Sequence, residues 1–99
     1  MPAYVIVQIE IRDPVVYERY KALAPASIAA HGGRYVARGG QTEALEGEWK
    51  PRRVVILEFD DIARARAWLD SPEYRDARAM RHASADTQMI VVEGLPRSM

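Results

Sequence analysis

Two side chains of opposite charge, Arg38 and Glu58, are the residues of this sequence best suited to chemistry. An arginine can hold a carboxylate or an enolate through two parallel hydrogen bonds. A glutamate in an apolar setting can have a raised pKa and act as a base. If the strands alternate regularly, both side chains share one face of a sheet with Gln8, Glu10 and Arg52. A few polar groups in an apolar concavity are typical of a small-molecule site.

The alternative interpretation of the same two residues is structural. Arg38 and Glu58 would then pair with each other, or with their counterparts across a dimer, because ion pairs of this kind also occur without any function.

Two histidines, His31 and His82, are the only imidazoles. His31 ends a predicted helix just before Gly32 and Gly33, where the negative end of the helix dipole favours its charged form. It is a second candidate for moving a proton, and a capping role is the alternative. His82 is more typical of a surface residue. Because the sequence has no cysteine and neither an HxH nor an HExxH spacing, we expect no metal site and no bound cofactor.

Aromatic side chains complete the predicted site. Trp49 lies in an irregular connection, where it either anchors the loop or closes the cavity against water. Tyr20 shares a stripe of the first helix with Tyr17, and either packs in the core or reaches a substrate with its hydroxyl. The predicted catalytic residues are Arg38, Glu58 and His31, and the predicted substrate-binding residues are Gln8, Arg52, Trp49 and Tyr20.

The Arg-Gly-Gly segment at 38–40 is a single copy at the end of a predicted strand. Glycine there is best explained by a turn that needs a positive φ angle. Neither GxGxxG nor GxxxxGK[ST] is present, so a nucleotide-binding loop is unsupported. The 14 basic and 14 acidic side chains balance, and we therefore expect no nucleic-acid partner.

Length and composition predict one domain, over residues 1–95, followed by a tail over 96–99. No apolar run approaches the length of a membrane span, so no membrane partner is expected. The first residues are typical of a strand and not of a signal peptide. These features predict a cytoplasmic protein.

The elements that would position the candidate residues follow from periodicity and capping signals. Pro25 lies inside the first predicted helix, so we expect a kink or a break near Leu23. The sequence predicts strands over 3–11, 34–38, 52–59 and 87–94, helices over 14–31 and 62–70, and a further helix from 72. This β-α-β-β-α-β order, with right-handed crossovers, predicts a ferredoxin-like α+β sandwich: a mixed four-stranded sheet with the helices on one face.

The other face of this sheet would carry Tyr4, Ile6, Val36, Val54 and Ile56. An apolar patch of this kind is rarely left in water. The simplest cover is the same face of a second copy, related by a two-fold axis. We therefore expect a homodimer in which two sheets face each other and enclose a cavity.

Several segments together carry a family resemblance: "GGRYVARGG", "LEGEWKPRRVVILEF", "ARAWLDSPEY" and the closing "VEG". Over residues 2 to about 95, the chain resembles domain-of-unknown-function family 1330, of the dimeric α/β-barrel superfamily. The resemblance implies a ferredoxin-like protomer and a dimer that forms sheet to sheet into an α/β barrel. It implies no established activity, although superfamily relatives include cofactor-free monooxygenases, haem-degrading enzymes and lactone isomerases.

The first functional hypothesis is a cofactor-independent enzyme for a small, partly apolar acidic or carbonyl substrate. Arg38 would orient the anion, Glu58 or His31 would move a proton, and Trp49 would exclude water. The alternatives are a small-ligand-binding protein without chemistry and a purely structural homodimer.

Overall fold

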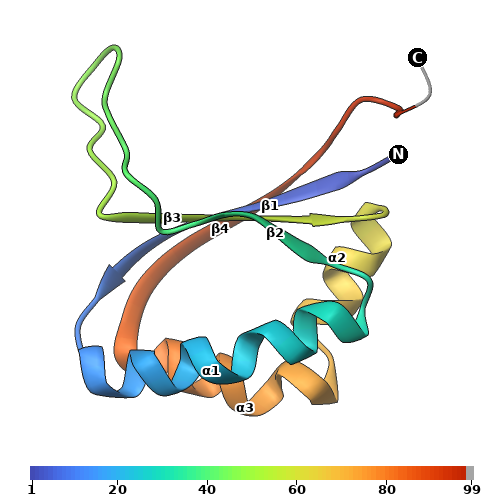
Figure 1. The fold of residues 1–99 in the computed structure, drawn as a ribbon, viewed down its shortest axis with the longest axis horizontal. Coiled ribbons are helices and arrows are strands. Elements are labelled where there is room, and N and C mark those ends of the chain that lie inside the picture. The colour runs from blue at the N-terminus through green and yellow to red at the C-terminus, as the bar shows by residue number, and fades with distance from the viewer. Residues whose placement is uncertain (98–99) are drawn as a thin grey trace.

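Four strands and three helices follow one another along the chain in the computed structural model, which describes residues 1–97 (Figure 1). The elements are β1 (Ala3–Ile11), α1 (Pro14–Ala30), β2 (Arg34–Arg38), β3 (Arg53–Phe59), α2 (Ile62–Leu69), α3 (Pro72–Ser84) and β4 (Ala85–Glu93). The helix expected from residue 72 is present and is longer than α2.

The sheet has the strand order β2-β3-β1-β4, and the helices cover one of its faces (Figure 1). All three strand pairings are antiparallel, so the prediction of a mixed sheet is wrong. The physical reason is that each helical crossover passes over one strand. β3 lies between β1 and β2, and β1 lies between β3 and β4, so parallel strands are never neighbours. The α+β sandwich with a ferredoxin-like order is otherwise as predicted.

Helix α1 begins and ends at the residues that its capping signals indicate. The Asp13 side chain accepts hydrogen bonds from the backbone N–H groups of Val15 and Val16, at 3.1 and 3.2 Å, and Pro14 occupies the first turn. At the other end, Gly32 has a φ angle of 73°. The Gly33 N–H donates to the carbonyl of Ile28 at 2.9 Å, which closes a Schellman motif.

Pro25 lies inside α1, and the helix continues through it. Of the kink or break expected near Leu23, the break is therefore not found. A proline has no N–H, so the carbonyl of Lys21, four residues earlier, loses its usual helix partner. The Nη2 group of Arg38 donates to that carbonyl oxygen at 2.8 Å. The arginine from β2 therefore supplies the hydrogen bond that the proline removes.

The core lies between the sheet and the helices. Alternate residues of β1 and β3 point into it, including Val5, Val7, Ile9, Val55 and Leu57. A run of contacting aromatic rings continues the core through the helices: Phe59 and Trp68 are 5.5 Å apart between ring centroids, Trp68 and Tyr74 4.3 Å, and Tyr74 and Tyr20 6.3 Å.

A β-bulge in β2 changes which face Arg38 occupies. The pairing of β2 with β3 shifts between Tyr35 and Ala37, so Val36 is an extra residue. After the shift, Arg38 lies opposite Val55, a core residue that faces the helices. The prediction that Arg38 lies on the open face of the sheet is therefore wrong, because regular alternation fails at the bulge.

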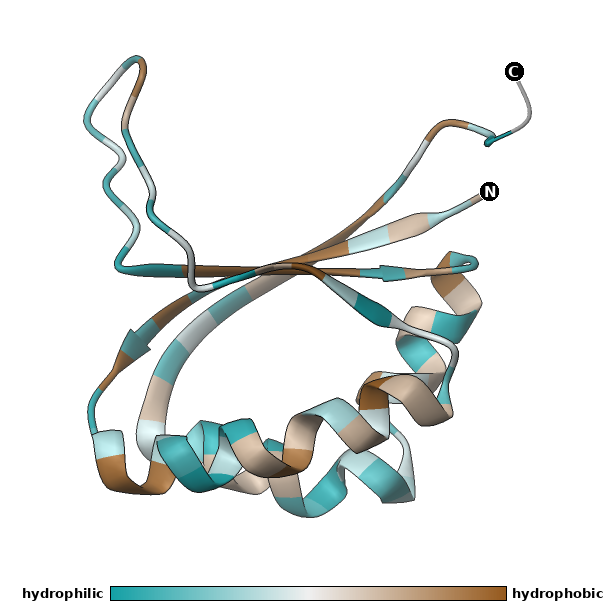
Figure 2. Cartoon of the chain, viewed as in Figure 1, coloured by the Kyte–Doolittle hydropathy of each residue, from teal (hydrophilic) through white to brown (hydrophobic). Residues whose placement is uncertain are grey.

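The helices leave the other face of the sheet uncovered, and the central parts of β1, β3 and β4 are hydrophobic (Figure 2). Ile90 is 61% exposed, Val36 50% and Val92 45%. The connection between β2 and β3 projects from the sheet on this side, away from the helices (Figure 1). Among the described helices, none is both long and apolar enough to cross a membrane.

Candidate functional site

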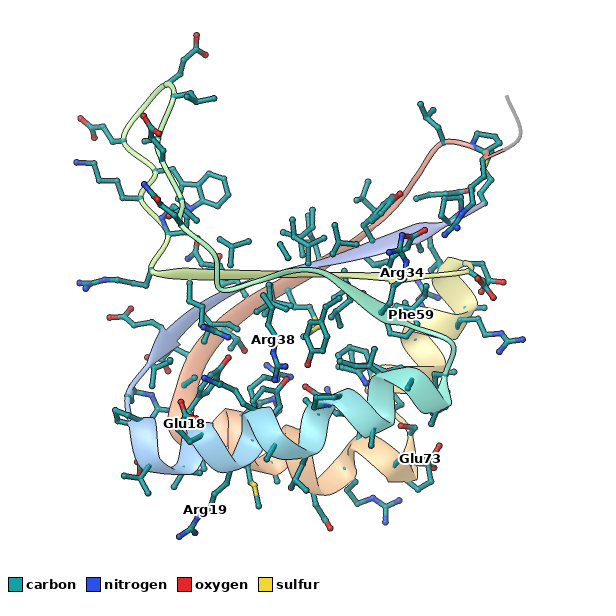
Figure 3. All side chains as sticks on the ribbon, in the orientation of Figure 1. Glu18, Arg19, Arg34, Arg38, Phe59 and Glu73 are labelled. Carbon is teal, nitrogen blue, oxygen red and sulfur yellow. The ribbon has the colours of Figure 1, made fainter. Side chains whose placement is uncertain are left out.

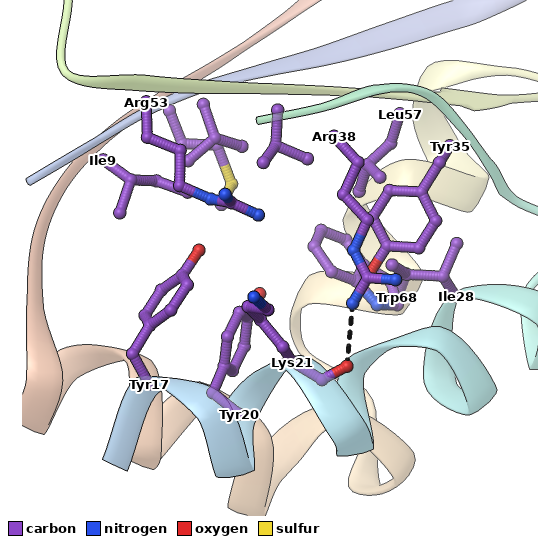
Figure 4. Close-up of a pocket in the computed structure, with 13 residues that line it drawn as sticks. Ile9, Tyr17, Tyr20, Lys21, Ile28, Tyr35, Arg38, Arg53, Leu57 and Trp68 are labelled. Atoms are coloured by element: carbon purple, nitrogen blue, oxygen red, sulfur yellow. Dashed lines mark hydrogen bonds between the residues drawn. The ribbon is translucent and has the colours of Figure 1, made fainter. Parts of the chain in front are cut away.

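A narrow pocket lies between α1 and the covered face of the sheet (Figure 4). Its wall is aromatic and aliphatic, and includes Tyr17, Tyr20, Tyr35 and Trp68. Three basic side chains also line it: Lys21 from α1, Arg38 from the end of β2 and Arg53 from the start of β3. These cationic groups in an apolar surrounding make it the best candidate for a functional site in the described part of the chain.

Arg38 enters the pocket from the sheet and reaches across to α1 (Figures 3 and 4). Its guanidinium lies 4.5 Å above the ring centroid of Tyr35, a cation–π contact. One of its nitrogens donates to the Lys21 carbonyl. Because a guanidinium has five N–H donors, the others remain for a ligand.

Arg53 is the functional candidate that the sequence reasoning missed. Its guanidinium lies 5.6 Å from the ring centroid of Tyr17, and its Nε atom is buried without a hydrogen-bond partner among the described residues. Alternation in the sequence did carry a signal, since it puts Arg53 on the same strand face as Val55 and Leu57. An arginine on a face that packs under helices has to reach either a partner or a ligand.

Gly39 allows Arg53 to take this position. A Cβ atom added at Gly39 would overlap the Nη1 atom of Arg53. Gly39 also has a φ angle of 71°, a conformation that side chains other than glycine rarely adopt. The first glycine of the Arg-Gly-Gly segment is thus a turn residue, as predicted, and it also leaves space for a second guanidinium.

The pocket has an excess of positive charge. Among residues 1–97, no carboxylate lies within ion-pair distance of Arg38 or Arg53. The nearest acid at the mouth, Glu18, pairs instead with Lys21 at 2.9 Å. Lys21 lowers the pKa of Glu18, and the charges of Arg53 and Arg38 lower it further. The electrostatic character of the mouth therefore favours anions.

Tyr20 contributes a neutral hydrogen-bonding group to the pocket wall. Burial raises the pKa of Tyr20 far above its ordinary value, and the neighbouring Tyr74 raises it further. The two hydroxyl oxygens are 2.7 Å apart. Tyr20 is therefore a phenol that stays protonated and can donate, and it cannot serve as a base near neutral pH.

The pocket is small in this conformation. The space open to a water molecule is about 20 Å³, which is room for about one water. A larger ligand requires side chains at the mouth to move. Lys21 and Arg38 are the flexible side chains there, and both are partly in contact with solvent.

Glu58 lies on the opposite face of the sheet from this pocket. Its side chain is 4% exposed and pairs with Arg34 of β2 and with Arg97 near the end of the chain. Figure 3 shows Arg34 and Arg38 leaving the short strand β2 toward opposite sides. Within one chain, the structure therefore excludes both a joint site and an ion pair of Arg38 with Glu58, because the sheet separates them.

The remaining predicted residues are also dispersed. Gln8 lies on the open face, where its Oε1 atom accepts a hydrogen bond from Nε1 of Trp49 at 2.6 Å, and Arg52 is exposed beside β3. His31 caps α1 and pairs with Glu73 of α3 at 2.8 Å. Of the seven predicted site residues, only Arg38 and Tyr20 line the pocket.

The fold and this pocket define a ferredoxin-like α+β protein with a candidate anion site beneath its first helix. The chain belongs to the family of domains of unknown function DUF1330, whose model matches residues 2–95. The sequence matches no curated protein.

Solved structures share the fold at low sequence identity. A protein of unknown function from Rhodopseudomonas palustris is 22% identical, with a TM-score of 0.78 over 96% of this chain and 83% of that chain. A dimeric ferredoxin-like protein of unknown function from Jannaschia sp. CCS1 is 18% identical, with a TM-score of 0.66 over 95% of this chain and 100% of that chain. SnoaB, a cofactor-independent oxygenase from Streptomyces nogalater, is 13% identical, with a TM-score of 0.66 over 98% of this chain and 96% of that chain.

Proposed function

We propose that this protein binds a small, partly apolar organic anion in the pocket beneath α1 and converts it without a bound cofactor. The observation that carries this proposal is that Arg38 and Arg53 enter one aromatic-lined pocket, where no described carboxylate forms an ion pair with them. The Arg53 guanidinium is half-buried, and its Nε atom has no hydrogen-bond partner among the described residues. A group of this kind is costly to bury, and an anionic ligand would offset that cost.

The proposed chemistry is the stabilisation of negative charge. Two guanidinium groups aimed at one region can bind a carboxylate and can also stabilise an enolate that develops beside it. The aromatic side chains Tyr17, Tyr35 and Trp68 would contact the apolar part of the substrate. Lys21, which lines the pocket, is the group positioned to exchange a proton with a bound substrate.

One protein that shares only the fold supports conversion without a cofactor. SnoaB, whose described role is that of a cofactor-independent oxygenase, superposes on nearly the whole chain. At 13% identity this is an analogy of architecture. Binding without conversion is the second candidate, and it is favoured by the absence of any carboxylate or imidazole from the described lining of the pocket.

The proposal includes a homodimer of the dimeric α/β-barrel type. The open face carries the exposed side chains of Val36, Ile90 and Val92, which a second copy of the same face would remove from water. The Jannaschia relative is described as dimeric. Gln8, Arg52, Trp49 and Glu58 would then lie at or near this interface. A cytoplasmic location, predicted from the composition, is also part of the proposal.

The test of the pocket begins with native mass spectrometry of the freshly purified protein, to identify any small acid that copurifies. Phenylacetate then serves as a defined probe, with its dissociation constant measured by NMR titration. We expect Arg38→Gln and Arg53→Gln each to weaken binding about tenfold or more, since each removes a charge-assisted contact. Arg19→Gln is the matched control, because Arg19 leaves α1 on the side of the helix away from the pocket (Figure 3). Equal affinities in all four proteins, or no binding of phenylacetate, would contradict the proposal.

A further inference from the structure

A buried chain of hydrogen bonds ends at the wall of this pocket. It begins at Arg81 of α3, which is 4% exposed. The Nε atom of Arg81 lies 3.2 Å from the hydroxyl oxygen of Tyr74, and that oxygen lies 2.7 Å from the hydroxyl oxygen of Tyr20. Tyr20 is the member that lines the pocket.

The direction of donation follows from counting protons. Arg81 can only donate, so Tyr74 accepts from it. Tyr74 is fully buried, and its own hydrogen therefore requires an acceptor. Among the described residues, the oxygen of Tyr20 is the acceptor within reach. The hydrogen of Tyr20 is then left to point away from Tyr74, toward whatever occupies the pocket.

Arg81 also brings a positive charge that is not neutralised locally. Within residues 1–97, no carboxylate lies at ion-pair distance from it. Its other contacts are neutral: the hydroxyl of Thr87, and the Nε2 atom of His82 at 3.4 Å. A buried cation at one end of a hydrogen-bond chain polarises the chain, which strengthens the donor at its other end.

We infer that the pocket selects an organic acid that carries a second oxygen acceptor close to its carboxylate, such as a 2-oxo acid, and that Tyr20 donates to this second oxygen. In this arrangement Arg38 and Arg53 hold the carboxylate. Tyr74 and Arg81 are positioning residues that orient the Tyr20 hydrogen. The inference rests on the proposed function, because it names the ligand class of the same pocket.

The chemistry that this arrangement suits is the accumulation of charge on the second oxygen. A carbonyl oxygen that becomes an enolate oxygen gains negative charge, and a polarised phenol donor binds the charged form more strongly than the neutral one. An acid with a methylene in place of the carbonyl would leave the Tyr20 hydrogen without a partner, and a site built to donate discriminates against such an analogue.

A pair of probes isolates this contact. Phenylglyoxylate and phenylacetate differ only in a carbonyl that replaces a methylene. We expect the wild-type protein to bind phenylglyoxylate about tenfold more tightly, as a single good hydrogen bond permits. Tyr20→Phe should reduce this ratio to about one, because phenylglyoxylate loses the contact that distinguishes it from phenylacetate. Tyr74→Phe should give an intermediate ratio, because Tyr20 keeps its hydroxyl but loses its orientation.

The ratio of the two affinities distinguishes a specific effect on recognition from general damage to the fold, because a loosened structure would weaken the binding of both probes together. Tyr4→Phe is the control, because it removes a hydroxyl from the opposite face of the sheet. Equal binding of the two probes by the wild-type protein would overturn the inference and leave the anion pocket standing. A ratio that survives Tyr20→Phe would overturn it as well, and a ratio unchanged in Tyr74→Phe would overturn the positioning role. If neither probe binds, the proposed function fails, and this inference fails with it.

Discussion

Arg38 donates to the backbone carbonyl of Lys21 at 2.8 Å, and this carbonyl is the one that Pro25 deprives of its helix partner. One side chain from the end of β2 therefore compensates for a proline in α1. The same side chain borders the pocket beneath that helix. The Arg38 guanidinium therefore has both a structural role and a proposed binding role.

This relationship predicts that substitutions at positions 25 and 38 have coupled effects on the free energy of unfolding. In the wild-type background, Arg38→Ala should lower the free energy of unfolding by about 1 kcal/mol, because it removes a hydrogen bond from a charged donor at a partly exposed site. In a Pro25→Ala background the cost should be smaller, since the new N–H can satisfy the Lys21 carbonyl. Urea denaturation of the four proteins in a double-mutant cycle measures the coupling. Strictly additive effects would show that the Arg38 contact does not compensate for the proline.

Two adjacent glycines provide a matched pair of substitutions. Gly39→Ala should destabilise the fold by about 1–2 kcal/mol, because the residue has a positive φ angle that alanine rarely adopts. The new Cβ would also overlap the flexible Arg53 guanidinium, which would have to move. The substitution should also weaken phenylacetate binding by displacing Arg53. Gly40→Ala should be nearly neutral in both respects, since a Cβ there would meet no atom within 4 Å. Thermal unfolding and the NMR titration measure the two effects, and similar behaviour of the two variants would refute the assignment of Arg53 to the pocket.

Glu58 tests whether the pocket is confined to one face of the sheet. Glu58→Gln should cost about 1–2 kcal/mol of stability, because it weakens the contacts of a buried carboxylate with two partly exposed arginines. The affinity for phenylacetate should stay at the wild-type value, since the sheet lies between Glu58 and the pocket. Chemical denaturation and titration of the same sample provide both numbers. A large loss of affinity in a folded protein would restore Glu58 to the site.

The proposed homodimer predicts a response to charge on the open face. Ile90→Lys should yield a monomer, because Ile90 is 61% exposed in the single chain and would be buried between two sheets. Size-exclusion chromatography with light scattering measures the mass. Leu23→Lys is the control, because it places the same charge on α1, on an exposed apolar residue outside the open face. A wild-type protein that is monomeric at micromolar concentration would rule out the dimer.

Local signals in the sequence determined most of the elements of this protein. Asp13-Pro14 and Ser71-Pro72 mark the starts of α1 and α3, and Gly32 marks the end of α1. These signals succeed because capping and left-handed turns depend on a few consecutive residues. Alternation in β1 and β3 likewise predicted which side chains enter the core, since the period of a regular strand is two.

The composition of the pocket was decided only by the tertiary structure. One extra residue at Val36 reverses the face of Arg38, because a shift of one position moves a strand residue to the other side of the sheet. The bond between Tyr20 and Tyr74 joins residues 54 positions apart, and no local pattern encodes such a contact. The sequence by itself thus determined the elements and their buried faces, whereas the site depended on a bulge and on long-range packing that periodicity cannot express.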